Sequence, residues 1–564
     1  MKVHARVKIN DSVNDYYFIN PIRVMTHRTH TLEEALHAAE SSLKEGYYCV
    51  PAISYERNNV YGNQDAPFMI GIFSDFSDEL TFNREPKAYN LTPLHFVDDR
   101  RTIEDNVERI RNYIRDGHTY QVNYTTRLRG NFTGDGHTLF LQLMHQNNGD
   151  YGFYIEHEDE MIISCSPELF FERDAQTIRT KPMKGTSKRY KDPLQDKESY
   201  NFLRNSMKDR AENVMIVDLL RNDLSKIAEK GSVHCPELFT IEKYATVYQM
   251  TSTVAAKLKS DITLNTLINS LFPCGSITGA PKLSTMKIIA ELETTPRHYY
   301  CGTLGLMLSP EQWVFNVPIR TLYIKGEDAV YGAGAGITYD SNPSDEYEEF
   351  VAKTSFLNHG YINLIESMRV EAGEVKRIEL HLERLVNSAK SFGYSIHKQD
   401  VFERINTYVT THLKDAVYKL RLQFNADESI ELTHEKVNHA SSMVGTLHHT
   451  PIRAAECFLE HKTTIRHHYQ LIDETALNLY YNRNNELSEF NIGNLVIKED
   501  NNFYTPPVRV GLLNGVMRQQ LLNNDTLSER VYLLDEFKEK YKRGILEVYM
   551  INSVREWTLV KLEI

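Results

Sequence analysis

Apolar and polar residues alternate over residues 1–90 in short runs, a pattern that predicts strands separated by turns. Residues 102–117 then follow a helical pattern that ends at Gly117. Residues 119–132 alternate again, as a strand with one buried face does. The first quarter of the chain therefore predicts a mixed α/β fold.

Two later segments have strong helical patterns. Residues 209–231 place apolar side chains at helical spacing from Val217 to Ile227, and Gly231 is expected to cap the C-terminus of this helix. Residues 341–357 predict a second helix, with Asn342 as its N-cap. A glycine-rich turn is predicted just before it, at residues 332–337.

The pattern changes after Leu357, where strand, turn, strand and helix follow in close succession. A chain of 564 residues is too long for one hydrophobic core. We therefore predict two domains, over residues 1–357 (with 1–90 as the first part) and residues 358–564.

Composition excludes several classes of protein. The 41% hydrophobic and 25% charged residues are ordinary for a globular protein, and a net charge of −12 disfavours nucleic-acid binding. No apolar run approaches the length of a membrane span, and the first twelve residues lack an apolar signal region. The scattered cysteines, without a CxxC pair, indicate a reducing compartment. We expect a cytoplasmic enzyme with no nucleic-acid or membrane partner.

Paired carboxylates lie on both predicted helices. Asp209 and Glu212 are three residues apart, as are Glu346 and Glu349, so each pair shares a helix face. Clustered carboxylates suit Mg²⁺, which prefers oxygen ligands. The alternative is two solvated acidic faces, and spacing alone favours it.

Two glycine-rich segments could bring bare backbone close to an anion. The segment GAGAGI at 332–337 lacks the strict GxGxxG spacing, and CGSITGAPK at 274–282 precedes a predicted helix. Taken alone, each segment is more often an ordinary tight turn.

The motifs SPELFF, PMKGT, DRAENVMIVDLLRND, LFPCGSITGAPK, FNVPIRTLYI and GAGAGITYDSNPSDEYEEF resemble the chorismate-binding enzyme family in order and spacing from about residue 90 to 357. This family includes anthranilate, isochorismate, salicylate and aminodeoxychorismate synthases. The resemblance implies an α/β sandwich of two large antiparallel sheets, with chorismate bound between them.

The resemblance also implies roles for the acidic residues. Glu212 and Glu349 match direct Mg²⁺ ligands, and Asp209 and Glu346 match residues that hold its waters. Glu168, in SPE, matches the general acid that protonates the departing C4 hydroxyl. We therefore expect Mg²⁺ as a cofactor.

Further matches are expected to contact the substrate. Arg320 and Lys353, with the backbone N–H groups of Gly334 and Gly336, match the clamp on the chorismate carboxylates. Thr186, in PMKGT, is expected to contact the substrate as well. A dianion in an acidic protein needs such donors.

Two positions discriminate among the reactions of the family. Lys184 stands where aminodeoxychorismate synthases have lysine and anthranilate synthases have alanine; such a lysine can attack ring C2 before ammonia adds at C4. Gln121 stands where the hydroxylating members have a lysine base. Glutamine cannot act as that base, so ammonia is the expected nucleophile. Several relatives have histidine just before the segment MTSTV, where this chain has Gln249. Because no GxCxG-type elbow with a following histidine is found, we expect the ammonia to come from a separate glutamine amidotransferase subunit.

Without a family resemblance, Lys462 would be interpreted as a surface lysine, although a glycine turn at 511–515 enters a helix that could bind phosphate. The segments HKTTIRHHY, ELSEFNIGNLVI and TPPVRVGLLNGVMR resemble fold-type IV pyridoxal-phosphate enzymes, which include aminodeoxychorismate lyase and several transaminases. The resemblance implies a smaller α+β domain with pyridoxal 5′-phosphate as cofactor.

In that family Lys462 matches the cofactor-binding lysine, and Glu489 matches the carboxylate that pairs with the pyridine nitrogen. Residues matched to the phosphate region are Arg384, Asn494, Gly515 and Val516. Gly493 and Met517 depart from the family, where hydroxyl residues are usual.

Ser367 aligns with a hydroxyl residue of the lyases, whereas His381 is expected to be structural. The two resemblances together imply amination of chorismate at C4, followed by elimination of pyruvate to give 4-aminobenzoate. The alternatives are an anthranilate synthase-like first half, a transaminase second half, and a non-catalytic second half that recruits the glutaminase.

Overall fold

The computed structural model divides the chain into two compact units. The first comprises residues 1–84 and 94–360, and the second comprises residues 85–93 and 361–564. The division after residue 360 falls near the boundary predicted at 358. The structure describes residues 1–564 except 10–11, 58–65, 79–86, 148, 191, 245–246, 438–441, 453, 455, 467, 470–476 and 564.

Two large sheets form the first unit, and their recorded pairings are antiparallel. One has the order β16 (Gly279–Ala280), β8 (Gln121–Gly134), β20 (Asp328–Ile337), β19 (Thr321–Lys325), β10 (Glu160–Ser166), β9 (Tyr151–His157), β1 (Lys2–Ile9), β2 (Ser12–Phe18), with β7 (His95–Phe96) also on β8. The other has the order β13 (Met183–Lys188), β15 (Val247–Lys257), β12 (Thr177–Lys181), β11 (Leu169–Asp174), β18 (Gln312–Asn316), β17 (Thr303–Ser309), β4 (Tyr48–Ile53), β5 (Phe68–Phe73), β3 (Arg23–Thr26), with β14 (His234–Lys243) on β15.

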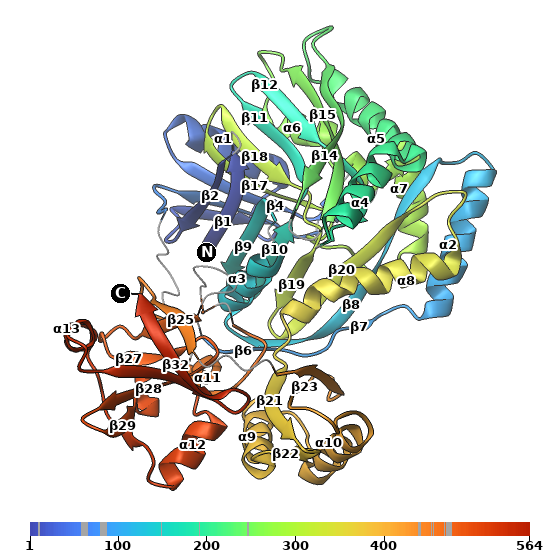
Figure 1. Cartoon of the computed structure of the whole chain (residues 1–564). Coiled ribbons are helices and arrows are strands. Elements are labelled where there is room, and N and C mark those ends of the chain that lie inside the picture. The colour runs from blue at the N-terminus through green and yellow to red at the C-terminus, as the bar shows by residue number, and fades with distance from the viewer. Residues whose placement is uncertain are drawn as a thin grey trace. The chain divides into compact units, whose positions relative to one another are not determined.

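The two sheets share a core. Val3 and Phe153 from one sheet and Val50 and Leu304 from the other belong to one cluster of fully buried side chains. The predicted two-sheet α/β sandwich is therefore confirmed (Figure 1). The helices of this unit are α1 (Leu32–Lys44), α2 (Arg100–Arg115), α3 (Gly136–Asn147), α4 (Pro193–Asn205), α5 (Met207–Ser225), α6 (Leu264–Leu271), α7 (Lys282–Leu292) and α8 (Pro343–Thr354).

The second unit contains two smaller sheets and is also α+β. The first has the order β22 (Glu374–Val375), β21 (Leu364–Glu371), β23 (Tyr418–Phe424), β24 (Ile430–Lys436), and α9 (Ile378–Ser391) and α10 (Lys398–His412) share its core. The second has the order β27 (Leu487–Phe490), β26 (Leu477–Tyr481), β25 (Ser442–Leu447), β32 (Glu556–Glu563), β31 (Glu547–Asn552), β28 (Gly493–Glu499), β29 (Asn502–Thr505), β30 (Ser528–Glu529). The remaining helices are α11 (Glu456–Glu460), α12 (Val516–Asn523) and α13 (Leu534–Lys542).

Several local predictions are confirmed. Gly117, at φ 81°, directly follows α2 and its C-cap. Asn342 caps α8 by accepting hydrogen bonds from the backbone N–H groups of Ser344 and Asp345, at 3.0 and 3.3 Å. Strand β8 covers the alternating segment predicted at 119–132. Side-chain spacing and capping chemistry are local, so these elements follow directly from the sequence.

Two local predictions are wrong. Gly231 does not cap α5, which ends at Ser225 with Lys226 as its C-cap, because the chain then turns and buries Ile227 and Ala228. The predicted turn at 332–337 is part of the extended strand β20. A Cβ on Gly334 would lie 2.5 Å from the carbonyl oxygen of Tyr124 on β8, so the glycine permits close strand packing there.

Within the described residues, no helix has the length and apolar character that crossing a bilayer requires.

Candidate active sites

A cavity of about 900 Å³ in the first unit collects residues from distant parts of the chain. Eleven of the twelve residues predicted for the first site line it: Glu168, Lys184, Thr186, Asp209, Glu212, Arg320, Gly334, Gly336, Glu346, Glu349 and Lys353. Strand β13 supplies the lysine, α5 and α8 supply the acidic pairs, and β20 supplies the two glycines.

Gln121 is the predicted residue that does not line this cavity. It is buried behind Gly336, where an added Cβ would lie 2.3 Å from Gln121 Nε2 and 3.6 Å from Lys184 Nζ. The missing side chain of Gly336 therefore leaves room for both groups. Gln121 therefore lies beside the bare backbone of Gly336 without lining the cavity.

Burial shifts the pKa values of Glu168 and Lys184, which line the same cavity. It raises the pKa of the Glu168 carboxyl to about 7, against the hydrogen bond from Ser276 and the positive charge of Lys184. Burial also lowers the pKa of the Lys184 amine, although Glu168 and Glu212 favour its protonated form. Burial therefore favours the protonated acid and the neutral amine, which are the forms that donate a proton and attack as a nucleophile.

The four carboxylates on α5 and α8 line the cavity without forming a closed cage. No group of three or more His, Cys, Asp or Glu side chains placed to hold a metal occurs among the described residues. Burial raises the pKa of Glu212 and of Glu346, and Glu346 Oε2 is buried without a hydrogen-bond partner in the described part of the chain. Such a donor set fits Mg²⁺, which keeps several waters and uses few protein carboxylates.

Lys353, on α8 with two of the carboxylates, and Arg320 are basic residues that line the same cavity. Lys353 Nζ donates to the carbonyl oxygen of Gly334 at 2.7 Å and forms an ion pair with Glu349 at 2.6 Å. Arg320 adopts φ 52°, a left-handed conformation that is uncommon for a non-glycine residue and that places it at the cavity. Both cations stand where an anionic ligand can reach them.

Gln249, which replaces the family's histidine, stabilises the strand that carries Lys184. Its Nε2 donates to the carbonyl oxygen of Gly185 at 2.8 Å, and its Oε1 accepts from the Thr186 hydroxyl at 2.7 Å. An amide thus orients β13 from the neighbouring strand β15.

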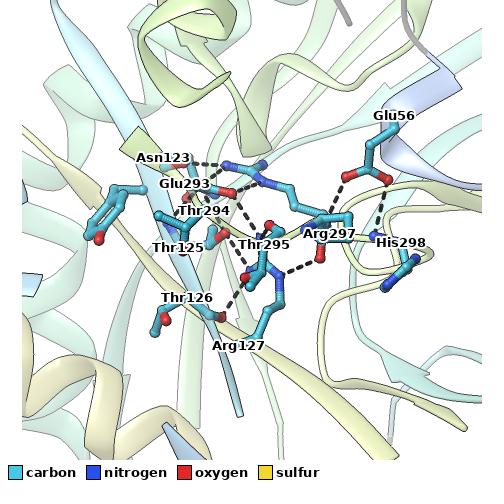
Figure 2. A network of polar contacts seen from close by, with 12 residues as sticks. Glu56, Asn123, Thr125, Thr126, Arg127, Glu293, Thr294, Thr295, Arg297 and His298 are labelled. Atoms are coloured by element: carbon cyan, nitrogen blue, oxygen red, sulfur yellow. Dashed lines mark hydrogen bonds and ion pairs between the residues drawn. The ribbon is translucent and has the colours of Figure 1, made fainter. Parts of the chain in front are cut away.

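A buried ion-pair network connects β8 to the segment after α7 (Figure 2). Glu293 accepts hydrogen bonds from the guanidinium groups of Arg127 and Arg297, at 2.6 to 2.9 Å. Arg297 also donates to the carbonyl oxygen of Asn123, a cavity-lining residue of β8, at 2.8 Å. Glu56 accepts from the backbone N–H of Arg297 at 2.6 Å. The network fixes β8 relative to the segment after α7, and sequence patterns gave no signal of it.

A second cavity, of about 520 Å³, lies in the second unit. All seven residues predicted for the second site line it: Ser367, Arg384, Lys462, Glu489, Asn494, Gly515 and Val516. Its volume is in the range of small-molecule and cofactor sites.

The pKa values of Lys462 and Glu489 are shifted in this cavity as well. Burial, followed by the nearby Arg384 guanidinium, lowers the pKa of Lys462 to about 7. Burial raises the pKa of Glu489 to about 7, although its carboxylate accepts hydrogen bonds from the Tyr469 hydroxyl at 2.7 Å, the Asn494 amide at 3.1 Å and the Leu513 N–H at 3.0 Å. These three donors fix the direction of the carboxylate.

The phosphate region has the expected shape for an anion. Gly515 is the N-cap of α12 and makes no side-chain cap, so the first N–H groups of the helix remain available to a ligand. A Cβ on Gly515 would lie 2.1 Å from Asn494 Oδ1, so only glycine fits. These features fit the phosphate of pyridoxal 5′-phosphate, with Lys462 and Glu489 available for its ring.

Glu366 is a functional neighbour that the sequence analysis missed. It accepts two hydrogen bonds from Arg384, at 2.8 and 2.7 Å, and it pairs with His381 Nδ1 at 2.6 Å. Against the effect of burial, the Arg384 guanidinium and the hydrogen bond with His381 hold the pKa of its carboxyl far below the usual range. His381 therefore helps to position the arginine. The sequence offered one signal for Glu366: it is a charged residue at a core-facing position of an alternating strand.

The fold and the two lysine–carboxyl sites define an enzyme with one amine-centred site in each unit. The chain belongs to the family described as chorismate binding enzyme, whose sequence pattern matches residues 33–359. The pattern described as amino-transferase class IV matches residues 363–562.

Aminodeoxychorismate synthase component 1 of Escherichia coli (strain K12) is 39% identical over 256 residues, which are 45% of this chain and 56% of that protein. The Bacillus subtilis (strain 168) protein of the same name is 39% identical over 247 residues, 44% of this chain and 53% of that protein. The chain thus spans little more than half the length of these relatives. The menaquinone-specific isochorismate synthase of Escherichia coli has the same fold, with a TM-score of 0.53 and 17% identity over 64% of this chain and 88% of that one.

Proposed function

We propose that this chain converts chorismate and ammonia into 4-aminobenzoate and pyruvate in two reactions. The first unit aminates chorismate at C4, and the second eliminates pyruvate from the resulting 4-amino-4-deoxychorismate. The observation that carries the proposal is Lys184, a half-buried lysine whose amine has a lowered pKa, in the same cavity as the Glu168 acid. Relatives named aminodeoxychorismate synthase component 1 support the same reaction.

In the first reaction, neutral Lys184 adds to ring C2 while the C4 hydroxyl leaves as water with a proton from Glu168. Ammonia then adds at C4, and the C2–nitrogen bond to Lys184 breaks, which restores the lysine. The net change exchanges hydroxyl for amine at C4. An alanine at position 184 could not form the adduct, which is why lysine there favours C4 amination over anthranilate formation.

The charges of the first cavity favour a cation together with a dianionic substrate. Its wall carries five carboxylates and four basic side chains: Glu168, Asp209, Glu212, Glu346, Glu349, Lys184, Lys208, Arg320 and Lys353. Mg²⁺, held directly by Glu212 and Glu349 and through water by Asp209 and Glu346, would supply positive charge beside the substrate carboxylate. Arg320, Lys353 and the N–H groups of Gly334 and Gly336 would then orient that carboxylate.

The second unit supplies Lys462 as a base and Glu489 as a carboxyl group held in a fixed direction. Pyridoxal 5′-phosphate, when bound, provides an electron sink for the carbon that loses its proton. Arg384, Asn494 and the N-terminus of α12 at Gly515 and Val516 would hold its phosphate, and Glu489 would face the ring nitrogen. Lys462, with a pKa of about 7, is positioned to take the C4 proton, and the Ser367 hydroxyl can guide that proton or the group that leaves from C3.

Ammonia would come from a separate glutamine amidotransferase subunit, which the relatives' designation as component 1 supports. The decisive experiment incubates the purified chain with chorismate, ammonium, Mg²⁺ and pyridoxal phosphate and separates the products. We expect 4-aminobenzoate and pyruvate in equal amounts. Anthranilate as the main product would refute C4 amination, and accumulation of aminodeoxychorismate without pyruvate would refute the lyase.

A further inference from the structure

Lys184 lies on an irregular stretch of its strand. Between Met183 and Thr186 the pairing of β13 with β15 shifts by one residue. Lys184 and Gly185 therefore both lie opposite Met250 of β15, which makes this stretch a β-bulge. A bulge changes the direction in which the side chains of a strand point, and the side chain that it directs here is that of the proposed nucleophile.

Only glycine fits the second position of the bulge. Gly185 adopts φ 89°, a conformation that other residues rarely adopt. A Cβ on Gly185 would lie 2.8 Å from Cβ of Asp209 on α5. The bulge is therefore packed against the helix that carries Asp209 and Glu212, and it cannot move further toward that helix.

The side chain of Gln249 holds the bulge from the β15 side. Its Nε2 donates to the carbonyl oxygen of Gly185 at 2.8 Å, and its Oε1 accepts from the Thr186 hydroxyl at 2.7 Å. One amide thus bonds a backbone acceptor inside the irregular stretch and a hydroxyl just after it. A bulge interrupts the regular pairing of strands, so these two hydrogen bonds replace part of the pairing that is lost.

The geometry of this stretch matters because the amine of Lys184 occupies a narrow space. A Cβ on Gly336 would lie 3.6 Å from Lys184 Nζ, and burial lowers the pKa of the amine. Relaxation of the bulge would move the amine from this position and expose it to more water, which favours its protonated form. A displacement of about 1 Å between reacting groups can slow a reaction by roughly 100-fold.

We propose that Gln249 is a positioning residue for Lys184: by fixing the glycine bulge, it keeps the amine directed at the substrate ring and thereby favours amination at C4 over direct addition of ammonia at C2. Gln249 acts through its two hydrogen bonds to β13 and takes no part in the bonds that are made or broken. This inference rests on the proposed amination and assigns one more residue to its specificity.

Gln249→Met tests the proposal, because it keeps the length of the side chain and removes both hydrogen bonds. With the full chain, chorismate, ammonium and Mg²⁺, kcat for C4 amination should fall roughly 10- to 100-fold, and the share of anthranilate among the products should rise. KM for chorismate should change less than about 2-fold, because Arg320 and Lys353 are untouched. The acid limb of the pH–rate profile should move to higher pH, since a more exposed amine keeps its proton to higher pH.

A second measurement reports the amine without any turnover. Acetic anhydride acetylates only the neutral form of a lysine, and mass spectrometry follows each site separately. In Gln249→Met, the pH at which Lys184 is half reactive should rise, whereas that of the exposed Lys188 on the same strand should not change. Thr186→Val removes one of the two hydrogen bonds at an exposed side chain and should shift the reactivity of Lys184 in the same direction.

Thr253→Val is the matched control, because Thr253 also lies on β15 but donates to Glu237 of β14, at 3.3 Å, and does not line the cavity. It should match the wild type in every measurement. The proposal is overturned if Gln249→Met keeps the wild-type kcat, product ratio and Lys184 reactivity. It is also overturned if KM for chorismate rises while kcat is unchanged, which would make Gln249 a substrate contact. If the wild type forms no C4-aminated product, the proposed amination fails, and the acetylation shift still decides whether Gln249 positions Lys184.

Discussion

The Glu168 carboxyl and the Lys184 amine line one cavity, and burial moves their pKa values toward each other. The pKa of Glu168 rises to about 7 and that of Lys184 falls. A surface pair of the same residues would be fully ionised at neutral pH. In the cavity, burial favours the protonated carboxyl of Glu168 and the neutral amine of Lys184, which are the forms that a proton donor and a nucleophile need.

The rate of amination should therefore depend on pH in a bell shape. The rate rises with pH as Lys184 loses its proton, and it falls as pH increases through about 7 because Glu168 loses the proton that it must donate. Glu168→Gln should slow amination by roughly 100- to 10,000-fold and abolish the alkaline limb. Initial rates of chorismate consumption with ammonium, measured from pH 5 to 9, test this. An alkaline limb that persists in the variant would assign it to another group.

Lys184→Ala should lose C4 amination, because no adduct at C2 can form. Any residual reaction with ammonium should add directly at C2 and give anthranilate. Lys188→Ala is the matched control, since Lys188 lies on the same strand but is exposed and does not line the cavity. Chromatography of the products decides the question. If Lys184→Ala makes aminodeoxychorismate at the wild-type rate, the nucleophile has been assigned wrongly.

Glu212→Gln and Glu349→Gln should each raise the Mg²⁺ concentration needed for half-maximal amination by at least roughly 10-fold, because each removes a carboxylate that we propose as a direct ligand. The elimination of pyruvate from added aminodeoxychorismate should be unaffected, since its residues lie in the other unit. Equal loss of both activities would contradict the assignment of these carboxylates and would point to a folding defect.

Glu293→Gln should lower the free energy of unfolding of the first unit by about 3–5 kcal/mol, because it leaves two buried guanidinium groups without their anion. The side chains of Arg127 and Arg297 are each 1% exposed. Glu291→Gln, two residues earlier, breaks a half-exposed pair with Arg109 and should cost less than about 1 kcal/mol. Urea denaturation followed by circular dichroism compares the two. Similar midpoints would show that the buried network contributes little.

Local chemistry was the part of the fold that the sequence predicted well. The cap at Asn342, the end of α2 before Gly117 and the alternation in β8 depend on neighbouring residues. Gly231 and the glycines at 332–337 were misinterpreted because their roles depend on packing between distant segments, which a turn pattern does not encode.

The same limit applies to the sites. Family motifs identified residues that share a cavity, such as Lys184 with Glu349 and Lys462 with Glu489. They did not identify Glu366, because its importance lies in its pairing with Arg384 and His381 on the following helix.

The division of labour between the two units is tested most directly by Lys462→Ala, incubated with chorismate, ammonium and Mg²⁺. The variant lacks the amine that takes the C4 proton, whereas the first cavity is intact. We predict that chorismate is still consumed and that aminodeoxychorismate accumulates without 4-aminobenzoate or pyruvate, until a separate lyase is added and converts it. Release of 4-aminobenzoate by the variant at the wild-type rate, with no contaminating lyase, would contradict the account.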